Sequence, residues 1–292
     1  MKQRFSPLCV GLLMGCMIFT GCMTKESSAG TGQSFKGPVG LQLYSLRDDF
    51  AKDVPGTMAK VSQMGIEYVE LAGTYGMSPT DFRRELNSHG LVAISGHFPY
   101  ERFRDDVESI AQEAKTLGLK YVGCAWIPHD GKFDEAKCRE VAAIFNHAGE
   151  ALAKHGMKFF YHTHGYEFEP YHKGTLFDLL MKETDPKYVS FEMDIFWIVN
   201  PGQDPVKLFK QYGSRWKLTH LKDMKKGTPV GVGAPVATKD DDVALGAGQL
   251  DMPAILRAAE KAGVEWNFIE DESAVAEEQI PVSLNYLQQV KF

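Results

Sequence analysis

Residues 189–223 read VSFEMDIFWIVNPGQDPVKLFKQYGSRWKLTHLKD and contain two short apolar stretches with a helical pattern between them. In residues 189–194 and 217–223, apolar and polar residues alternate, which is typical of β-strands. In residues 205–212, apolar residues recur three and four positions apart, which is typical of an amphipathic helix. The stretch therefore predicts a strand–helix–strand unit with parallel strands.

The same unit recurs along the chain from residue 38 onward. The expected strands are residues 39–45, 68–72, 91–97, 121–127, 158–164, 189–194, 217–223 and 266–271. The expected helices are residues 54–64, 79–88, 102–117, 134–155, 176–183, 205–212, 252–262 and 282–290. Eight alternating strands and helices predict a single α/β domain over residues 38–292, a (β/α)8 TIM barrel. A doubly wound open sheet is the alternative, but no glycine-rich nucleotide loop follows the first strand.

The first residues have the form of a secretory signal. Lys2 and Arg4 precede an apolar run over residues 5–19 that stops at small and polar residues. A charged start followed by a short apolar core is typical of a signal peptide, which we place at residues 1–21. A retained transmembrane anchor is the alternative, although the run is shorter than the roughly 20 residues that a membrane span needs.

The signal ends in a possible lipidation site. Residues 19–22, Phe-Thr-Gly-Cys, resemble the bacterial lipobox, in which the cysteine becomes the lipidated first residue, although Phe replaces the usual Leu. We prefer Cys22 to Cys16 because residues 22–37 are rich in Gly, Ser, Thr and Lys and read as a flexible tether. The sequence thus predicts an exported lipoprotein, anchored to a membrane through Cys22.

Composition excludes some functions. The chain is 44% hydrophobic and 24% charged, which is ordinary for a globular protein, and its net charge of −6 does not favour nucleic acid. Three of the five cysteines lie in the signal region, and Cys124 and Cys138 lack the spacing of a zinc site or a disulfide framework. We expect both to be buried thiols; a disulfide between them after export is the alternative.

Four polar residues end successive predicted strands. His162, Asp194, His220 and Glu270 are each about one strand–helix unit from the next, with one longer interval before Glu270. Active sites of such barrels lie at the carboxyl ends of the strands, so these side chains should converge. Two imidazoles and two carboxylates suit Mn, Zn, Co or Fe(II).

Each of the four also has a structural explanation. A lone histidine at a strand end is more often a hydrogen-bonded core residue than a ligand, and Glu270 could cap the following helix. Because all four share one predicted rim, we favour a divalent metal site.

Further polar and aromatic residues lie at the same predicted rim. Hydroxyl recognition and ring stacking are the roles we expect for the substrate-binding candidates, which are Tyr44, Glu70, His97, Trp197 and Lys222. Trp126 follows the fourth strand and could anchor its loop or stack on a sugar. The long loop over residues 225–249 is expected to be a lid or a binding loop.

Several motifs together carry a resemblance to a known family. They are LQLYSLR at 41–47, YVEL at 68–71, HTH at 162–164 followed by EF at 167–168, MDIFW at 193–197, HLKD at 220–223, GAG at 246–248 and ED at 270–271. With them, residues 38–292 resemble the xylose isomerase-like TIM barrels of the sugar phosphate isomerase/epimerase superfamily, which also holds inosose dehydratases and an apurinic endonuclease branch.

The resemblance implies roles for some of these residues. Asp194, His220 and Glu270 match the family's metal positions. The fourth ligand is commonly a glutamate on the fifth strand, and that glutamate and the one on the eighth strand are the two proton-transfer groups in epimerases. Here the fifth strand offers His162, with His164 and Glu167 close behind. The expected catalytic residues are therefore His164, Glu167 and Glu270. Trp197 stands where many relatives have a second histidine.

These observations lead to a hypothesis about function. We expect a divalent-metal-dependent sugar isomerase or epimerase that moves a proton next to a carbonyl. Export suggests an unphosphorylated sugar or keto-sugar on the periplasmic side of a bacterial membrane. The alternatives are a lyase or dehydratase acting on a keto-sugar or keto-glycoside, and a non-catalytic carbohydrate-binding lipoprotein. Acidic charge and lipidation disfavour an endonuclease, and the sequence leaves a homo-oligomer open.

Overall fold

The computed structural model describes Met1 and residues 29–292, which form a closed barrel of eight parallel strands. The barrel strands are β1 (Val39–Gln42), β2 (Tyr68–Leu71), β3 (Val92–Phe98), β4 (Tyr121–Cys124), β5 (Lys158–His162), β8 (Val189–Asp194), β9 (Trp216–Leu221) and β12 (Trp266–Ile269). They follow one another around the barrel in chain order, and β1 pairs with both β2 and β12. The predicted barrel is confirmed.

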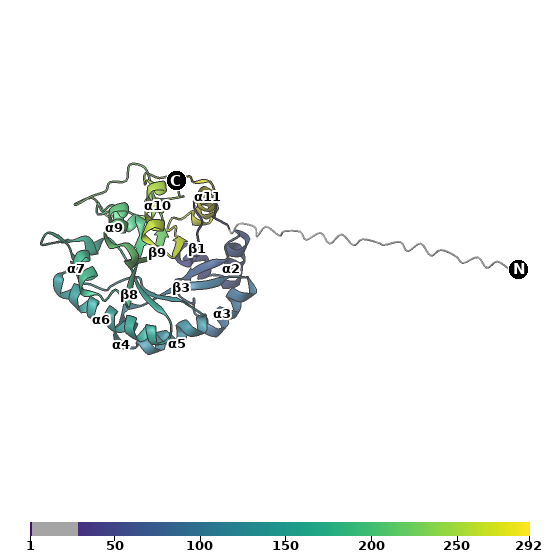
Figure 1. Cartoon of the computed structure of the whole chain (residues 1–292), viewed down its shortest axis with the longest axis horizontal. Helices are drawn as coiled ribbons and strands as arrows, with labels where there is room; N and C mark the ends of the chain where they lie inside the picture. Colours follow the sequence, from purple (N-terminus) through teal and green to yellow (C-terminus); the bar gives the residue numbers. More distant parts are fainter. Residues whose placement is uncertain (2–28) are drawn as a thin grey trace.

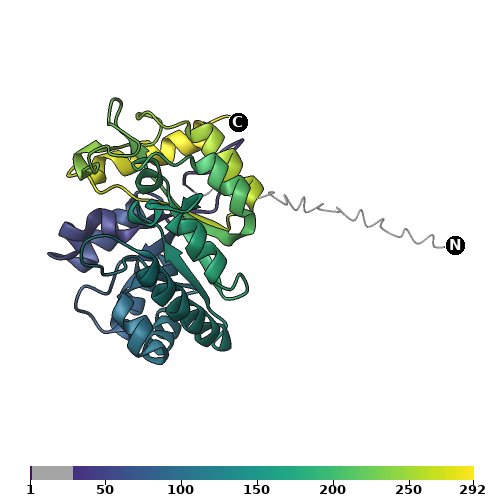
Figure 2. The same ribbon diagram turned by 90° about the vertical axis from the view of Figure 1, so that its left-hand side faces the viewer.

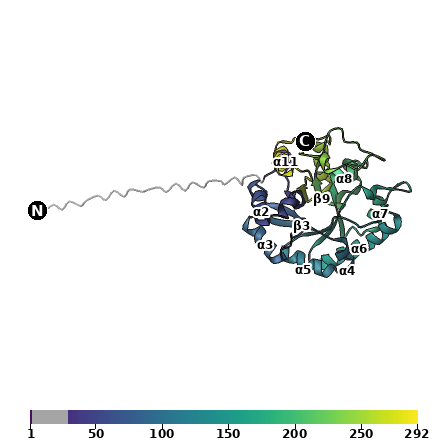
Figure 3. The same cartoon turned by 180° about the vertical axis from the view of Figure 1, so that it is seen from behind.

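Helices surround the barrel (Figures 1 and 3). They are α1 (Arg47–Phe50), α2 (Val54–Gln63), α3 (Pro79–Ser88), α4 (Tyr100–Asp105), α5 (Val107–Leu117), α6 (Glu135–Lys154), α7 (Leu176–Glu183), α8 (Ile195–Val199), α9 (Pro205–Tyr212), α10 (Met252–Ala262) and α11 (Ala276–Gln289). Short 3-10 helices are η1 (Leu43–Leu46), η2 (Tyr166–Phe168), η3 (Gly213–Arg215) and η4 (Lys239–Asp241). Two small hairpins join β6 (Pro170–Tyr171) to β7 (Gly174–Thr175) and β10 (Asp223–Met224) to β11 (Asp242–Val243).

The alternation of side chains along the strands separates two apolar layers. Ile94, Tyr121, Phe160, Leu218 and Phe268 pack against one another in a small inner cluster, while a larger cluster fills the space between strands and helices. Because side chains two positions apart on a strand share a face, the next inward residues beyond Phe160, Leu218 and Phe268 are polar. The inner apolar cluster therefore lies beneath a polar end of the barrel.

Several predicted element ends are wrong, for local reasons. The first strand stops at Gln42 instead of residue 45, because the Gln42 side chain accepts the backbone N–H of Tyr44 at 3.0 Å and starts η1. The fourth and fifth strands end at Cys124 and His162, each earlier than predicted. The helix predicted over residues 102–117 divides where Asp106 caps α5. The last helix begins at Ala276, six residues before its predicted start.

The described part of the predicted tether is not a free segment. Phe35 is buried with 6% of its surface exposed, and the backbone N–H of Phe292 donates to Ser34 Oγ at 3.2 Å. Figure 2 shows the purple start of the domain beside the C-terminus. Residues 34 and 35 therefore pack against the folded domain, and the domain boundary at residue 38 stays a prediction.

Other predictions for the N-terminal region lie outside the described residues. Cys22 and, apart from Met1, the predicted signal peptide over residues 1–21 fall in this part. Within the described part, no helix has the length and apolar character that crossing a membrane requires. Cys124 and Cys138 are free and buried, as expected.

The long loop after the seventh barrel strand is anchored by one aspartate. Asp223 accepts backbone N–H groups from Met224, Gly246, Gly248 and Leu250 at 2.8 to 3.2 Å. A Cβ on Gly248 would lie 2.1 Å from Asp223 Oδ1, so only glycine allows this approach. The GAG motif at 246–248 therefore shapes the loop, and the N–H groups of Gly246 and Gly248 donate to Asp223.

Candidate metal centre and cavity

The four predicted metal ligands come from four neighbouring barrel strands. His162 and Asp194 are the last residues of β5 and β8, His220 lies in β9, and Glu270 follows β12. Asp194 and His220 stand side by side in the strand register. The barrel therefore brings together residues that are 108 positions apart in the chain.

Their ligand atoms converge at the polar end of the barrel. His162 Nε2 and His220 Nδ1 each lie 3.7 Å from Asp194 Oδ2, and His220 Nδ1 lies 3.0 Å from Glu270 Oε2. All four side chains are buried. We call these four residues the metal tier.

The metal tier fits a divalent cation. Within the described part of the chain, Asp194 Oδ2 is buried without a hydrogen-bond partner, although a buried carboxylate oxygen normally has one. Imidazole and carboxylate ligands together suit cations of intermediate softness. Asp194, His220 and Glu270 have ligand atoms close enough to share one ion. These residues could therefore hold the predicted metal.

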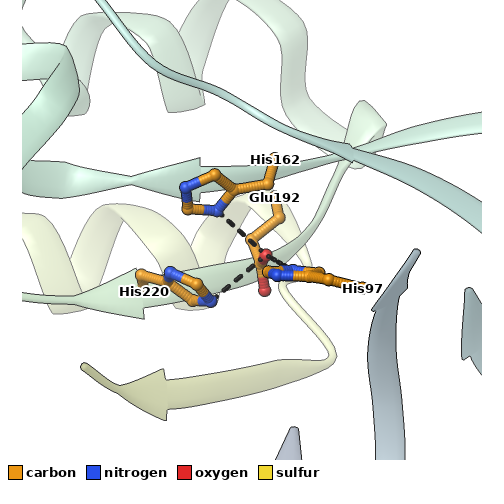
Figure 4. A group of neighbouring side chains, drawn as sticks. All are labelled: His97, His162, Glu192 and His220. Carbon is orange, nitrogen blue, oxygen red and sulfur yellow. Dashed lines mark hydrogen bonds and ion pairs between the residues drawn. The ribbon is translucent and has the colours of Figure 1, made fainter. Parts of the chain in front are cut away.

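A second set of polar side chains lies one step deeper in the barrel. Glu192 precedes Asp194 by two positions on β8 and points the same way, and its Oε2 lies 3.1 Å from His162 Nδ1, 3.2 Å from His220 Nε2 and 3.1 Å from His97 Nε2. Figure 4 shows the Glu192 carboxylate between the three imidazole rings. We call Glu192, His97 and Glu70 the support tier.

The support tier contacts one ring nitrogen of each ligand histidine. His220 Nε2 also lies 2.6 Å from Glu70 Oε1. With a cation in the metal tier, His220 Nε2 and His162 Nδ1 would carry the ring hydrogens and donate them to Glu70 and Glu192, because carboxylate oxygens accept hydrogen bonds. The lone pairs of His220 Nδ1 and His162 Nε2 then face Asp194. This is the arrangement in which metal-bound histidines are usually held.

The support tier could itself hold a cation. His97, His162, Glu192 and His220 have ligand atoms within 4.8 Å of one another. A cation there would bind His162 Nδ1 and His220 Nε2, which are not the nitrogens that face Asp194. Each imidazole can therefore offer a lone pair to one tier and a hydrogen to the other.

Buried charge shifts the pKa values of the support tier. Burial, together with the nearby Glu70 carboxylate, raises the pKa of Glu192 to about 7. Burial opposes ionisation of Glu70 as well, but His97 and His220 lower its pKa below the usual range. The two glutamates thus differ, and Glu70 is the one that stays ionised at neutral pH.

Lys222 is a buried cation at this site. Although burial disfavours an ammonium group, Asp194, Glu270, Glu272 and Asp242 raise the pKa of Lys222 well above its ordinary value. Its Nζ lies 3.6 Å from Asp194 Oδ2, 3.1 Å from Glu270 Oε2 and 3.8 Å from Asp242 Oδ2. Lys222 therefore orients Glu270 and neutralises part of this acidic cluster.

A cavity of about 880 Å³ opens above the metal tier. Five of the predicted substrate-binding or catalytic residues line it, namely Tyr44, His97, His164, Trp197 and Glu270. His162 and His220 also line it, which connects the cavity to the metal tier. Glu70, Lys222 and Asp194 lie behind these residues and are not part of the lining.

Glu167 is buried behind the cavity wall. Its Oε1 accepts hydrogen bonds from the Tyr161 hydroxyl and, at 2.9 Å, from the backbone N–H of His164, while Oε2 has no partner among the described residues. Burial raises the pKa of Glu167 to about 7. The structure therefore places Glu167 where it supports the His164 loop, and not among the residues that line the cavity.

Several residues of the site were not assigned a role from the sequence. Glu192 shares the inward face of β8 with Asp194, but its position between three imidazoles depends on strands β3, β5 and β9. Asp242 and Glu272 reach Lys222 from two separate loops. The shared face of Glu192 and Asp194 was a usable signal in the sequence, whereas nothing in the sequence around Asp242 pointed to the site.

Comparisons with known proteins agree with this geometry. The family model described as xylose isomerase-like TIM barrel matches residues 58–290. A solved sugar phosphate isomerase/epimerase from Parabacteroides distasonis is 26% identical with a TM-score of 0.70, over 90% of this chain and 95% of that one. The IolI protein, solved with a binding zinc atom, shares the fold at 16% identity with a TM-score of 0.65, over 85% of this chain and 96% of that one.

Curated relatives match over shorter stretches. An inosose dehydratase of Clostridium botulinum is 25% identical over 194 residues, which are 58% of this chain and 62% of that protein. An inosose dehydratase of Clostridium perfringens is 32% identical over 105 residues, or 33% of each chain. The chain thus spans less than two thirds of the length of these relatives.

The contacts of Glu192 with His162 and His220 predict that Glu192→Gln weakens metal binding. Because Glu192 orients two ligand histidines, its loss of charge should weaken binding of Mn²⁺ or Zn²⁺ by about 10- to 100-fold, as for other outer-sphere partners. Competition with a chelator of known affinity measures this change. Glu265→Gln, at the opposite end of the barrel, is the control and should leave the metal affinity unchanged. If Glu192→Gln lowers the metal affinity as much as Asp194→Asn does, Glu192 is instead a metal ligand.

The raised pKa of Glu167 predicts that the stability of the fold depends on pH. A carboxyl whose pKa is raised by folding stabilises the folded state below its unfolded pKa, and this contribution is lost as the pH rises through the folded value of about 7. Glu167→Gln removes this titrating group. Between about pH 4 and pH 8, the free energy of unfolding should therefore fall by about 3 kcal/mol more in wild type than in the variant. Urea unfolding at the two pH values measures this difference. Glu169→Gln, at a half-buried neighbour, is the control and should behave like wild type. Equal losses of stability in wild type and Glu167→Gln would contradict the assignment.

Proposed function

The chain belongs to the family of xylose isomerase-like TIM barrels, and from that premise we propose that it is a divalent-metal-dependent sugar isomerase or epimerase. The observation that carries this proposal is the convergence of His162, Asp194, His220 and Glu270 beneath a cavity, with Asp194 Oδ2 lacking a partner in the described structure. Mn, Zn, Co and Fe(II) all suit this ligand set.

A bound divalent cation would polarise a sugar carbonyl and make the neighbouring carbon more acidic. Two side chains of the cavity are placed to move that proton. Lys222 and His220 lower the pKa of Glu270, against the effect of its burial, so Glu270 is an ionised base. Burial lowers the pKa of His164 to about 4, so its imidazole is neutral and can accept a proton.

His164 follows β5 and Glu270 follows β12, so the two side chains reach the cavity from different segments. His164 Nδ1 is buried without a partner in the described structure, which leaves it free to bond a substrate hydroxyl or proton. Proton return at the other face or the neighbouring carbon gives an epimer or an isomer. We assign Glu167 to the positioning of His164 instead of to direct proton transfer.

The cavity lining supports an unphosphorylated sugar. None of the described residues that line it is a lysine or an arginine, the side chains that usually bind phosphate. Lys222 is buried among four carboxylates and is already paired. Hydroxyl-rich, uncharged substrates suit the histidines, Tyr44 and Trp197 better than a sugar phosphate does.

A lyase or dehydratase is the second candidate, and one observation favours it. The glutamate expected to be catalytic on the fifth-strand loop, Glu167, lies behind the wall and therefore does not face Glu270 across the cavity. A neutral His164 beside one carboxylate could remove the proton while an oxygen substituent leaves. The inosose dehydratases among the relatives are consistent with this candidate.

Deuterium incorporation tests proton transfer. In heavy water with Mn²⁺ and a panel of keto-sugars, the wild-type protein should introduce solvent deuterium at the carbon beside the carbonyl, detected by NMR. Glu270→Gln should reduce this exchange at least about 100-fold, the usual scale for a general base. Glu265→Gln should exchange normally.

Two outcomes would reject this function. Turnover without deuterium incorporation contradicts proton transfer. If His220→Ala and Glu270→Gln abolish metal binding while sugar binding is unchanged and no substrate is converted, the non-catalytic carbohydrate-binding alternative is correct.

We also propose export and lipid anchoring at Cys22, on the periplasmic side of a bacterial membrane. The charged, apolar and small-residue order of residues 1–22 supports this proposal. In a bacterial host, wild type should fractionate with membranes and Cys22→Ala should not, with Cys16→Ala as the control. Membrane association that persists in Cys22→Ala would contradict lipidation at this residue.

A further inference from the structure

Exposed apolar side chains are concentrated at the mouth of the cavity. Tyr44, Trp126, Val232 and Val236 are 43%, 51%, 94% and 76% exposed, and all four line the cavity. They are four of the nine large hydrophobic residues that are exposed in the described structure. Apolar surface gathered in one concave place marks a binding site more often than scattered exposure does. We call these four residues the apolar mouth.

The cavity has two chemically different ends. Its floor consists of His162, His220, Glu270 and His97, whereas its mouth is lined by carbon-rich side chains. Its volume of about 880 Å³ lies near the upper end of the roughly 300–1,000 Å³ typical of ligand pockets. A single sugar ring held at the floor leaves the apolar mouth uncovered.

Trp126 is a fixed wall of this mouth. Its ring stacks on His129 at 5.4 Å and meets the edges of Tyr166 at 5.0 Å and His164 at 5.1 Å. The next backbone group, Ile127 N–H, donates to the Tyr166 hydroxyl at 3.1 Å. Trp126 therefore stays half exposed because its neighbours hold it, and it loses little freedom when a ligand covers it.

Trp126 lies beside His164, which in turn lies beside His162. The His164 ring is 4.8 Å from the His162 ring and 5.1 Å from the Trp126 ring. A sugar that contacts the metal tier and His164 therefore has Trp126 within reach of its substituents.

The two valines face the mouth from an anchored loop. Gly231 N–H donates to Asn200 O at 2.9 Å, and Asn200 Nδ2 donates to Pro235 O at 3.2 Å. After Val236, Ala237 is buried against Phe196 and Met224. These contacts hold both ends of the segment, so the exposure of Val232 and Val236 belongs to the cavity rim.

We propose that the apolar mouth is a second subsite, which binds the aromatic aglycone of a glycoside while the sugar ring occupies the floor. This inference rests on the proposed function for its placement of the sugar at the metal tier. It names the substrate class as aryl glycosides whose sugar bears the carbonyl, in place of free sugars. Stacking on Trp126 and burial of the valines stabilise the bound aglycone.

Matched glycosides test the subsite by binding alone. Isothermal titration of the Mn²⁺-loaded protein would compare 4-nitrophenyl with methyl β-glycosides of glucose, galactose and xylose. For at least one sugar, the aryl compound should bind about tenfold more tightly or better, which corresponds to one well-covered aromatic contact. Trp126→Ala and the double variant Val232→Ser, Val236→Ser should each reduce this preference to within about twofold and leave methyl glycoside binding unchanged.

The control is Val282→Ser, which changes an exposed valine on α11 that does not line the cavity. It should keep the full aryl preference. No aryl preference for any sugar, no binding of any aryl glycoside, or a preference that survives both mouth variants would overturn the subsite. Failure of deuterium exchange would reject the proposed chemistry but leave a measured, Trp126-dependent preference intact, so the two failures are distinguishable.

Discussion

Parallel pairing of β1 with β12 closes the barrel, and the polar site depends on that closure. Once the sheet has no edge, the carboxyl ends of all eight strands form one ring, and side chains two positions apart point into it. Phe160, Leu218 and Phe268 fill the ring below. The next inward positions on their three chain segments carry His162, His220 and Glu270, so the apolar layer of the core sets the depth of the polar layer.

Burial of several carboxylates in this ring imposes a second constraint. Isolated buried charges are costly, so each must be paired or must bind a cation. Lys222 pairs with Glu270 and its acidic neighbours, and the imidazoles of His97 and His220 pair with Glu70 and Glu192. Asp194 Oδ2 is left without a hydrogen bond in the described structure, at the place where a metal would compensate it. Electrostatic pairing and metal binding thus use the same side chains.

The regular parts of the fold could be predicted from local patterns, and the irregular ends could not. Apolar periodicity located all eight barrel strands and gave the limits of α3, α7, α9 and α10. It misplaced the end of β1 and joined α4 to α5, because the Gln42 and Asp106 side chains bond nearby backbone N–H groups. Such local bonds compete with regular structure without changing the hydrophobic pattern.

For the site, the sequence alone determined that His162, Asp194, His220 and Glu270 end successive strands, because strand period and spacing are local properties. Only the tertiary structure decided which nitrogen of each histidine faces Asp194, and that Glu167 lies behind the wall. It also gathered the apolar mouth from three separate loops. These facts depend on distances between segments far apart in the chain, and closure of the barrel sets those distances.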